Sequence, residues 1–216
     1  MERKNNIIKC ECGCKYVCGY NDDEEKHDEI HDEYLHGAYM DDLKDLKPIE
    51  KVSGYPLFMI DVTIHKDMRL RLARAERALQ RETNLPTCYD GTISDDERLF
   101  LMEDKSRAIA MIFTVIDNKH CCCIWNPDGT LRVLTNESSD KLRQKICRVW
   151  IAKAYRRRGI GSLMVKAVVE FLGYKLSDLV WELPLSRDGA LLVKQLYPLK
   201  FWGSGDKFAL WESLTA

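Results

Sequence analysis

The segment between residues 146 and 173 constrains the fold of this chain most, because it joins an apolar run to a helix through a basic turn. Residues 146–151 (ICRVWI) are a short apolar run, which predicts a strand. Residues 163–172 are apolar enough to form a buried helix, and Gly173 is placed to end it. The turn between them, YRRRGIGS at residues 155–162, places arginines and glycines at the start of the helix.

A turn of this kind can bind an anion. The first helical turn leaves backbone N–H groups free, and the helix dipole adds partial positive charge. Gly159 and Gly161 let the backbone approach a phosphate closely without a Cβ clash. Their spacing is neither the Rossmann nor the Walker pattern. The alternative is a solvated basic turn, because a motif this short is permissive.

The residues that follow favour the binding interpretation. Residues 179–183 (LVWEL) predict another strand, and residues 189–197 predict a short amphipathic helix that Pro198 ends. Residues 208–211 (FALW) predict a last strand. The spacing Arg156-x-x-Gly159-x-Gly161 resembles the pyrophosphate loop of the GNAT acetyltransferases, which holds acetyl-coenzyme A. Leu196-Tyr197 followed by Phe201 is similar to the second motif of that family.

The middle of the chain predicts antiparallel strands. Residues 95–103 and 107–117 alternate or run apolar around a short turn, as a hairpin does. Residues 121–125 and 131–134 flank Asn-Pro-Asp-Gly, a strong turn signal. The three adjacent cysteines at 121–123 cannot all ligate one ion from an extended strand, so we interpret them as small buried hydrophobes. Residues 135–144 are polar and predict a loop near the substrate entrance.

The composition is that of an ordinary soluble protein. The chain has 216 residues and 45% hydrophobic content, enough for one full domain and a small module. A net charge of -1 gives no general attraction to nucleic acid or membranes. No apolar run reaches the length of a membrane span, and the polar N-terminal residues are no secretory signal. Nine cysteines without such a signal indicate a reducing compartment, where thiols bind metal or stay free.

The cysteines at the N-terminus predict a metal site. Four thiols, at Cys10, Cys12, Cys14 and Cys18, precede His27 and His31, which lie one helical turn apart in a charged run at residues 23–34. That spacing puts both imidazoles on one helix face, and two thiols complete a tetrahedron around zinc. So short a segment has no core of its own, and the metal would supply most of its folding free energy. The alternative is a disordered leader. The Cys10–Cys14 and Cys14–Cys18 gaps are of ordinary length, whereas Cys10–Cys12 is tighter.

A Cys/His finger before a GNAT-like segment resembles one family, the cohesin acetyltransferases that establish sister-chromatid cohesion. The finger of that family reads Cys-Gly-x-x-Tyr, an acidic stretch and His-x3-His, and this chain has Cys12-Gly13-Cys14-Lys15-Tyr16, acids at 22–25 and His27-x3-His31. The resemblance makes Cys12 a ligand and leaves Cys10 as the first one, with Cys14 or Cys18 as replacements. It therefore implies that zinc binds Cys10, Cys12, His27 and His31.

The resemblance continues through the rest of the chain. Residues 54–60 (GYPLFMI) look like the family's first strand, and a basic helix at 67–85 stands where the family has its long helix. Cys147 to Ile151 resemble its Ser-Arg-Ile-Trp-Val strand, and Leu185 to Gly189 sit at its Pro-Thr-Pro-Asp-Gly. The implied fold is α+β, a GNAT-like mixed and mostly antiparallel sheet flanked by helices. The implied domains are a finger at 1–40 and an acetyltransferase domain at 48–216, with a linker over 41–47.

The resemblance implies direct transfer of an acetyl group from acetyl-coenzyme A to a lysine amine. A carboxylate or ordered water deprotonates the amine, and a backbone N–H near Trp150 or Ile151 meets the oxyanion. Tyr197 stands where many GNATs keep a tyrosine that protonates the thiolate, although a packing role is the alternative. The residues expected to contact the cofactor are Val149, Trp150, Ile151, Arg157, Arg158, Gly159, Ile160, Gly161, Ser162, Ser186, Arg187 and Asp188.

The chain departs from the family at its two acidic positions. The family has one acidic residue in the helix after the phosphate loop, and this chain has Lys166 at that position. The family has the other in a Ser-Asp-Pro-Thr region, where this chain has Pro184. Neither carboxylate carries over. Glu182 and Glu170 are the nearest substitutes for the catalytic base, with Glu182 on the strand that should splay from the cofactor strand. Asp188 would instead shape the cofactor site.

Two functions follow from these observations. The first is a lysine acetyltransferase that acts on the SMC-type ATPase subunit of cohesin, is nuclear and chromatin-associated, and has partners among chromatin factors. The second is an adaptor or pseudoenzyme that binds coenzyme A or cohesin without efficient turnover. Acetylation of a small amine is a weaker alternative, because such enzymes rarely need a docking finger. Neither membrane binding nor sequence-specific nucleic-acid binding is expected.

Overall fold

The computed structural model describes residues 6–40, 43, 46–61, 63, 93–139 and 141–205. The helix expected at 67–85, the strand expected at 208–211 and much of the expected linker at 41–47 lie outside these residues. In the part of the chain that is described, no helix is long and apolar enough to cross a membrane.

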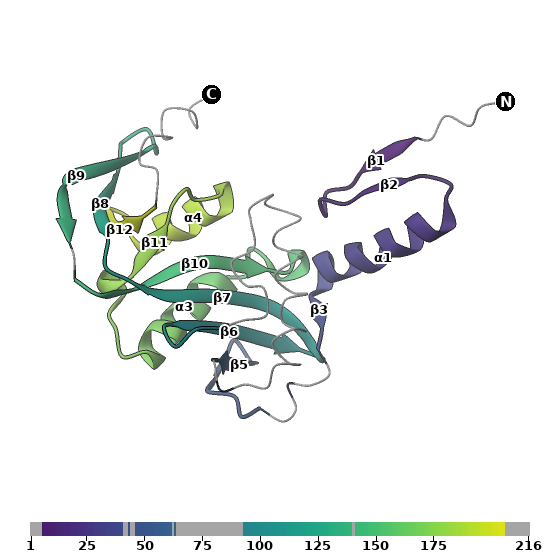
Figure 1. Ribbon diagram of the computed structural model, residues 1–216, viewed down its shortest axis with the longest axis horizontal. Helices are drawn as coiled ribbons and strands as arrows, with labels where there is room; N and C mark the ends of the chain where they lie inside the picture. Colours follow the sequence, from purple (N-terminus) through teal and green to yellow (C-terminus); the bar gives the residue numbers. More distant parts are fainter. Residues whose placement is uncertain are drawn as a thin grey trace.

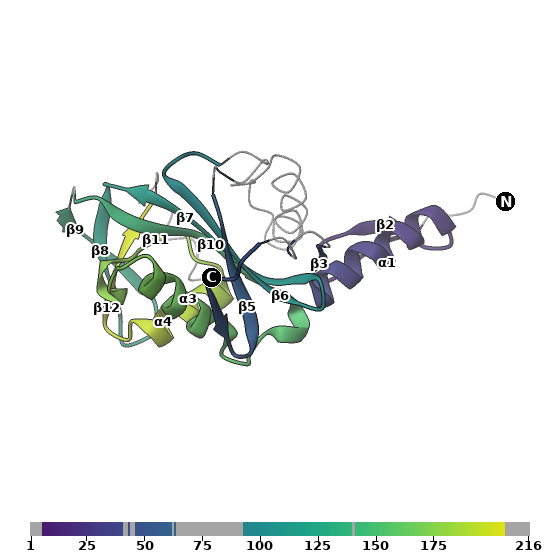
Figure 2. The same ribbon diagram turned by 90° about the horizontal axis from the view of Figure 1, so that it is seen from below.

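The N-terminal segment forms a small module. Strands β1 (Ile7–Lys9) and β2 (Lys15–Val17) pair antiparallel, and helix α1 (Asn21–His36) follows them. Figures 1 and 2 show this module projecting from one end of the molecule. The predicted helix at 23–34 is therefore confirmed and is slightly longer than expected. The short strand β3 (Ala38–Tyr39) then joins the module to the main sheet by pairing with β7.

One ten-stranded sheet forms the body, in the order β4-β5-β6-β7-β10-β11-β12-β8-β9, with β3 beside β7. Its pairs are antiparallel except for β10 with β11 and β11 with β12, which confirms a mixed, mostly antiparallel sheet. The strands are β4 (Glu50–Val52), β5 (Tyr55–Ile60), β6 (Glu97–Asp104), β7 (Arg107–Asp117), β8 (His120–Trp125), β9 (Leu131–Ser139), β10 (Arg143–Ile151), β11 (Val180–Glu182) and β12 (Lys200–Ser204).

Two helices cover one face of the sheet (Figure 2). Helix α3 (Ile160–Phe171) begins inside the basic turn, three residues before the predicted start, and Gly173 follows its end at φ 74°. Helix α4 (Arg187–Leu196) starts where the Ser186 hydroxyl accepts a hydrogen bond from the Gly189 N–H at 3.1 Å. Short 3-10 turns, η2 (Lys153–Tyr155) and η3 (Leu176–Asp178), precede α3 and β11.

Apolar side chains form a core on each face of the sheet. Met164, Val165 and Val168 of α3 pack on one face together with Phe100 and Ile112. The opposite face carries a second cluster, which contains Phe58, Ile60, Leu101, Met111 and Trp150. Because neighbouring residues of β10 point to opposite faces, this strand contributes to both cores and is held from both sides.

One expected loop was wrong, and one strand of the sheet was not expected. The predicted loop at 135–144 belongs mostly to strands, since β9 runs to Ser139 and β10 begins at Arg143. Polar residues form strands there because β9 pairs with β8, with His120 opposite Ser139. Strand β12, at residues 200–204, was not expected at all. Gly203 allows its close packing, because a Cβ at that position would lie 2.7 Å from the Cys123 sulfur.

Candidate functional site

Strands β10 and β11 diverge at the centre of the sheet. Their parallel pairing is limited to Lys145 with Val180 and Ile146 with Trp181. Strand β10 continues to Ile151 and remains paired with β7 on its other side, with Ile151 opposite Ala110. The edge of β10 at residues 149–151 therefore faces an opening between the two strands. The predicted splay beside Glu182 is present.

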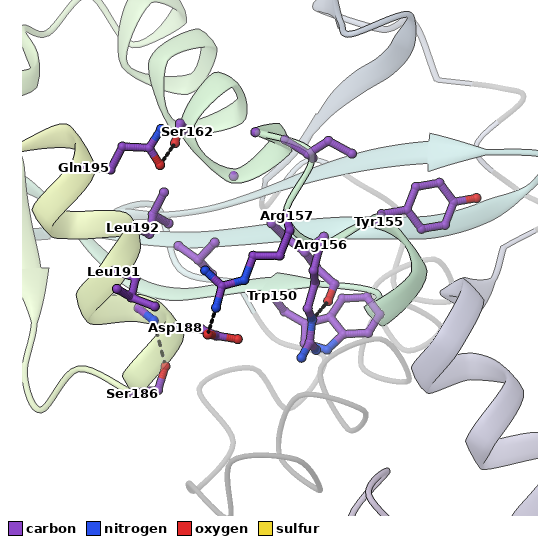
Figure 3. Close-up of a pocket in the computed structure, with 16 residues that line it drawn as sticks. Trp150, Tyr155, Arg156, Arg157, Ser162, Ser186, Asp188, Leu191, Leu192 and Gln195 are labelled. Atoms are coloured by element: carbon purple, nitrogen blue, oxygen red, sulfur yellow. Dashed lines mark hydrogen bonds and ion pairs between the residues drawn. The ribbon is translucent and has the colours of Figure 1, made fainter.

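A cavity of about 400 Å³ lies along this edge, between β10, the basic turn and helix α4 (Figure 3). Ten of the expected cofactor residues line it, and Arg158 and Arg187 do not. Sequence reasoning missed six lining residues, of which Arg156 lies inside the recognised motif and Leu192 on the apolar face of the predicted helix. The lining residues are Val149, Trp150, Ile151, Tyr155, Arg156, Arg157, Gly159, Ile160, Gly161, Ser162, Ser186, Asp188, Gly189, Leu191, Leu192 and Gln195.

The basic turn presents the N-terminus of α3 to this cavity. Arg157 and Gly159 adopt left-handed conformations, with φ of 60° and 77°, and so reverse the chain immediately before the helix. No described side chain caps α3, whose preceding residue Gly159 offers only its backbone. The free N–H groups of the first turn and the helix dipole thus remain available to an anion.

Each arginine of the turn has a different position. The Arg156 Nε donates to the Ile151 carbonyl oxygen at 2.7 Å, which ties the turn to the end of β10. Arg157 is exposed and lies 3.1 Å from Asp188 of α4, so that this ion pair crosses the cavity mouth (Figure 3). The Arg158 guanidinium lies 5.5 Å from the centre of the Tyr155 ring, and Arg158 does not line the cavity. Arg157 is therefore the arginine best placed to meet a phosphate.

None of the three expected catalytic residues lines this cavity. The Tyr197 hydroxyl donates to the Leu176 carbonyl oxygen at 2.7 Å, and burial raises the pKa of Tyr197 to about 12. These contacts favour the packing role of Tyr197 over that of the thiolate's proton donor. Glu170 is exposed near the end of α3, eight residues beyond Ser162, or about 12 Å along the helix axis. The helix carries it away from the site.

Glu182 is the expected catalytic residue that the structure places near the opening. It ends β11, one residue past the last pair with β10. Its Oε2 lies 3.2 Å from an Arg148 guanidinium nitrogen, and the side chain is 30% exposed. The carboxylate is thus held beside the point where the strands separate and still meets solvent.

The finger brings together the four expected metal ligands. The sulfurs of Cys10 and Cys12 and a ring nitrogen each of His27 and His31 all lie within 4.8 Å of one another. Two thiols and two imidazoles at this separation match the donor set of a tetrahedral structural zinc site. Burial raises the pKa of Cys10, but hydrogen bonds from Cys12 and His27 lower it to about 6, which favours the metal-binding thiolate.

A tight turn explains the short gap between the two cysteines. The Cys10 N–H donates to the Cys14 carbonyl oxygen at 2.9 Å, and the Gly13 N–H donates back to the Cys10 carbonyl at 3.1 Å. Gly13 has φ 84° and supplies the reversal. The alternative ligands Cys14 and Cys18 lie outside the cluster, with Cys18 exposed.

The finger contacts the residues that lead into the basic turn. This contact was not predicted from the sequence. Lys153 forms an ion pair with Glu11. The charged groups of Lys153 and Arg156 each lie 5.5 Å from the centre of the Tyr34 ring of α1. On the other side, Arg107 bonds Asp32 at 2.7 Å. The finger is thereby fixed beside the cofactor cavity.

Comparisons with known proteins agree with this geometry. A family model described as acetyltransferase (GNAT) family matches residues 66–175. No curated protein sequence matches the chain. Among solved structures, the xEco2 acetyltransferase domain is similar, with a TM-score of 0.62, 16% identity, and coverage of 74% of this chain and 96% of that one. The xEco2 acetyltransferase domain bound to a K105-CoA conjugate gives a TM-score of 0.61, 14% identity, and coverage of 74% and 97%. At these identities the likeness shows the fold.

Proposed function

Because this chain belongs to the GNAT acetyltransferase family and is an acetyl-coenzyme A-dependent acetyltransferase, we propose that its acceptor is a lysine side chain of a protein. The observation that carries this proposal is the position of the finger. A Cys/His module that contacts the turn before the phosphate loop, through Tyr34 and Glu11, provides a protein-docking surface beside the cofactor cavity.

Binding of the cofactor uses backbone groups more than side chains. The free N–H groups of the first turn of α3 and the Arg157 guanidinium receive the pyrophosphate. The open edge of β10 at residues 149–151 offers backbone groups to the amides of the pantetheine arm. That arm then leads the thioester towards the opening beside Glu182. Acetyl-coenzyme A supplies the activated acetyl group.

Glu182 is the proposed general base. The acceptor lysine enters as an ammonium and must lose a proton before its nitrogen can attack the thioester. The Arg148 contact at 3.2 Å orients the Glu182 carboxylate beside the opening, where it can accept that proton. Its partial exposure leaves a path to solvent through which the proton departs.

We further propose that the acceptor belongs to the SMC-type ATPase subunit of cohesin, and that the protein acts in the nucleus on chromatin to establish sister-chromatid cohesion. Three observations support this. The finger has the Cys/His order of the cohesin acetyltransferases, the Cys147–Ile151 segment resembles their strand, and the fold is similar to the xEco2 acetyltransferase domain. A protein acceptor also accounts for a finger attached to a GNAT body.

One observation favours a second function, that of an adaptor with little turnover. Lys166 and Pro184 occupy the two positions where the family carries carboxylates, and both are exposed. Under this alternative the cavity binds coenzyme A and the finger docks a partner, while Glu182 serves only as the ion-pair partner of Arg148.

Acetylation assays separate these functions. The full chain is incubated with acetyl-coenzyme A and one of three acceptors: the cohesin ATPase head, an unrelated lysine peptide, or a polyamine. Mass spectrometry locates the acetyl groups. We expect cofactor-dependent acetylation of a lysine in the ATPase head, slowed by Glu182→Gln about a hundredfold or more. Tight coenzyme A binding without acetylation of any acceptor would establish the adaptor, and a preference for the polyamine would exclude a protein acceptor.

A further inference from the structure

Charged and polar side chains from β7, β10, β11 and β12 lie on one face of the sheet, around the short paired segment of β10 and β11 that precedes the opening. Lys145 of β10 is opposite Val115 of β7 and Val180 of β11. Asp117 and Glu182 each lie two residues beyond those partners. Because strand side chains alternate between faces, Asp117, Lys145 and Glu182 share one face and are diagonal neighbours.

Asp117 is held by three donors. Its Oδ2 lies 3.0 Å from the Lys145 ammonium and accepts the Ser204 hydroxyl hydrogen bond at 2.6 Å. Its Oδ1 accepts the Lys119 backbone N–H at 2.9 Å. Burial raises the pKa of Asp117, but these donors lower it to about 2. The carboxylate is therefore ionised near neutral pH, where it forms an ion pair with Lys145.

Lys145 lies between two carboxylates and is bound by one of them. Burial lowers its pKa, but the pair with Asp117, with contributions from Cys147 and Glu182, raises it. The side chains of Lys145 and Asp117 are 18% and 16% exposed, so water screens this pair little. Glu182, meanwhile, is paired with Arg148. A second ion pair, Arg143 with Asp178 at 3.6 Å, already engages the Asp178 carboxylate.

Removal of the Asp117 charge would change which carboxylate Lys145 contacts. A half-buried ammonium without a partner is costly, and a lysine side chain is flexible enough to turn. After Asp117, Glu182 is the carboxylate among the described residues that contributes most to raising the pKa of Lys145. Glu182 would then lie between two cations, which makes it a weaker base. The Lys145 ammonium would also occupy the space that the acceptor ammonium needs.

We propose that Asp117 is a positioning residue for acetyl transfer, which holds Lys145 away from Glu182 so that the Glu182 carboxylate can receive the acceptor's proton. This inference rests on the proposed role of Glu182 as base. In the step itself, the proton passes from the acceptor ammonium to Glu182. The amine lone pair forms the C–N bond at the thioester carbon, and the C–S bond breaks with its electron pair on sulfur.

The test uses Asp117→Asn, which keeps an acceptor oxygen for Ser204 and removes the charge. We expect kcat to fall about ten- to a hundredfold while the Kd for coenzyme A stays unchanged. The acidic limb of the kcat profile should move to lower pH, because two cations then lower the pKa of Glu182. The double variant Asp117→Asn with Lys145→Met should recover most of the lost rate, because it lacks the misplaced ammonium. Asp178→Asn, which frees Arg143 on the same face, is the matched control and should retain the rate.

A second measurement does not depend on turnover. Carbon NMR of the Glu182 carboxyl group should give a lower pKa in Asp117→Asn than in the native protein, and the double variant should restore it. An unchanged Glu182 titration, or a double variant as slow as the single one, overturns the inference. If Glu182→Gln is slow but Asp117→Asn is not, only the positioning role is refuted. If the native protein acetylates no lysine, the proposed function is refuted, and this inference with it.

Discussion

Replacement of Gly161 by aspartate tests the phosphate loop directly. Gly161 is buried in the first turn of α3 and lines the cavity. A Cβ at this position would lie 3.1 Å from the Ile151 Cδ1 and 3.5 Å from the Leu192 Cδ1. Both neighbours are ends of flexible side chains, which can move by a few tenths of an ångström. An acidic residue at a helix N-terminus is itself favourable by about 0.3–1 kcal/mol, so the variant should fold.

The new carboxylate would oppose the pyrophosphate. Two unit charges about 5 Å apart in a medium of effective dielectric about 20 repel each other by roughly 3 kcal/mol. That energy corresponds to a Kd about a hundredfold weaker. The added side chain contributes steric hindrance as well, and an uncharged side chain of equal size isolates that part. Gly161→Asn is therefore the matched control.

Calorimetric titration with coenzyme A measures both variants, and thermal unfolding checks the fold. We expect Gly161→Asn to bind several-fold more weakly than the native chain, and Gly161→Asp about a hundredfold more weakly than Gly161→Asn. The gap between them should narrow as salt rises, because salt screens exposed charges. If both variants bind equally well, no phosphate lies at the start of α3, and the loop is only a basic turn.

Three further predictions concern the finger, its junction with the sheet and the response to acid. Metal analysis should find about one zinc per chain, and none in the variant with His27→Ala and His31→Ala; retained zinc would place the site elsewhere. Gly37→Ala should lower the free energy of unfolding in urea by about 2 kcal/mol or more. The reason is that Gly37 has φ 95° and a Cβ there would lie 2.3 Å from the Ala108 carbonyl oxygen. An unchanged midpoint of urea unfolding would contradict this geometry. The pKa of Asp117 is lowered to about 2, so its charge should contribute roughly 2 kcal/mol of stability above about pH 4 that is lost as pH falls towards 2. The free energy of unfolding of Asp117→Asn, measured over the same pH range, should lack this loss. An identical dependence of the unfolding free energy on pH in both proteins would refute the prediction.

The strand, the phosphate turn and the helix after it were predictable because their signals are local. Glycine spacing, an apolar run and a helix-ending Gly173 act within a few residues, so tertiary contacts altered only the helix start. The finger cluster was predictable for the same reason, since His27 and His31 share a helix face by spacing alone. Its tight cysteine gap depends on Gly13, which directly follows Cys12 in the sequence.

The catalytic candidates were less predictable because a residue's direction depends on distant packing. Tyr197 follows a recognisable motif, yet its hydroxyl bonds Leu176 and not the cavity. Glu170 is one turn from Lys166 in sequence, but α3 carries it away from the site. Strand β12 was missed because a short segment that contains glycine has little strand preference until β8 and β11 pair with it.

What the sequence alone determined is the chemistry available: a basic turn at a helix start, two thiols with two imidazoles, and an acidic residue on the strand after the helix. Only the tertiary structure decided which of these groups meet. Backbone pairing stops at Ile146 and so opens the cavity, and the register across β7, β10 and β11 places Asp117, Lys145 and Glu182 on one face. Such contacts join residues far apart in the chain, and their geometry follows from strand order and register, which no local pattern encodes.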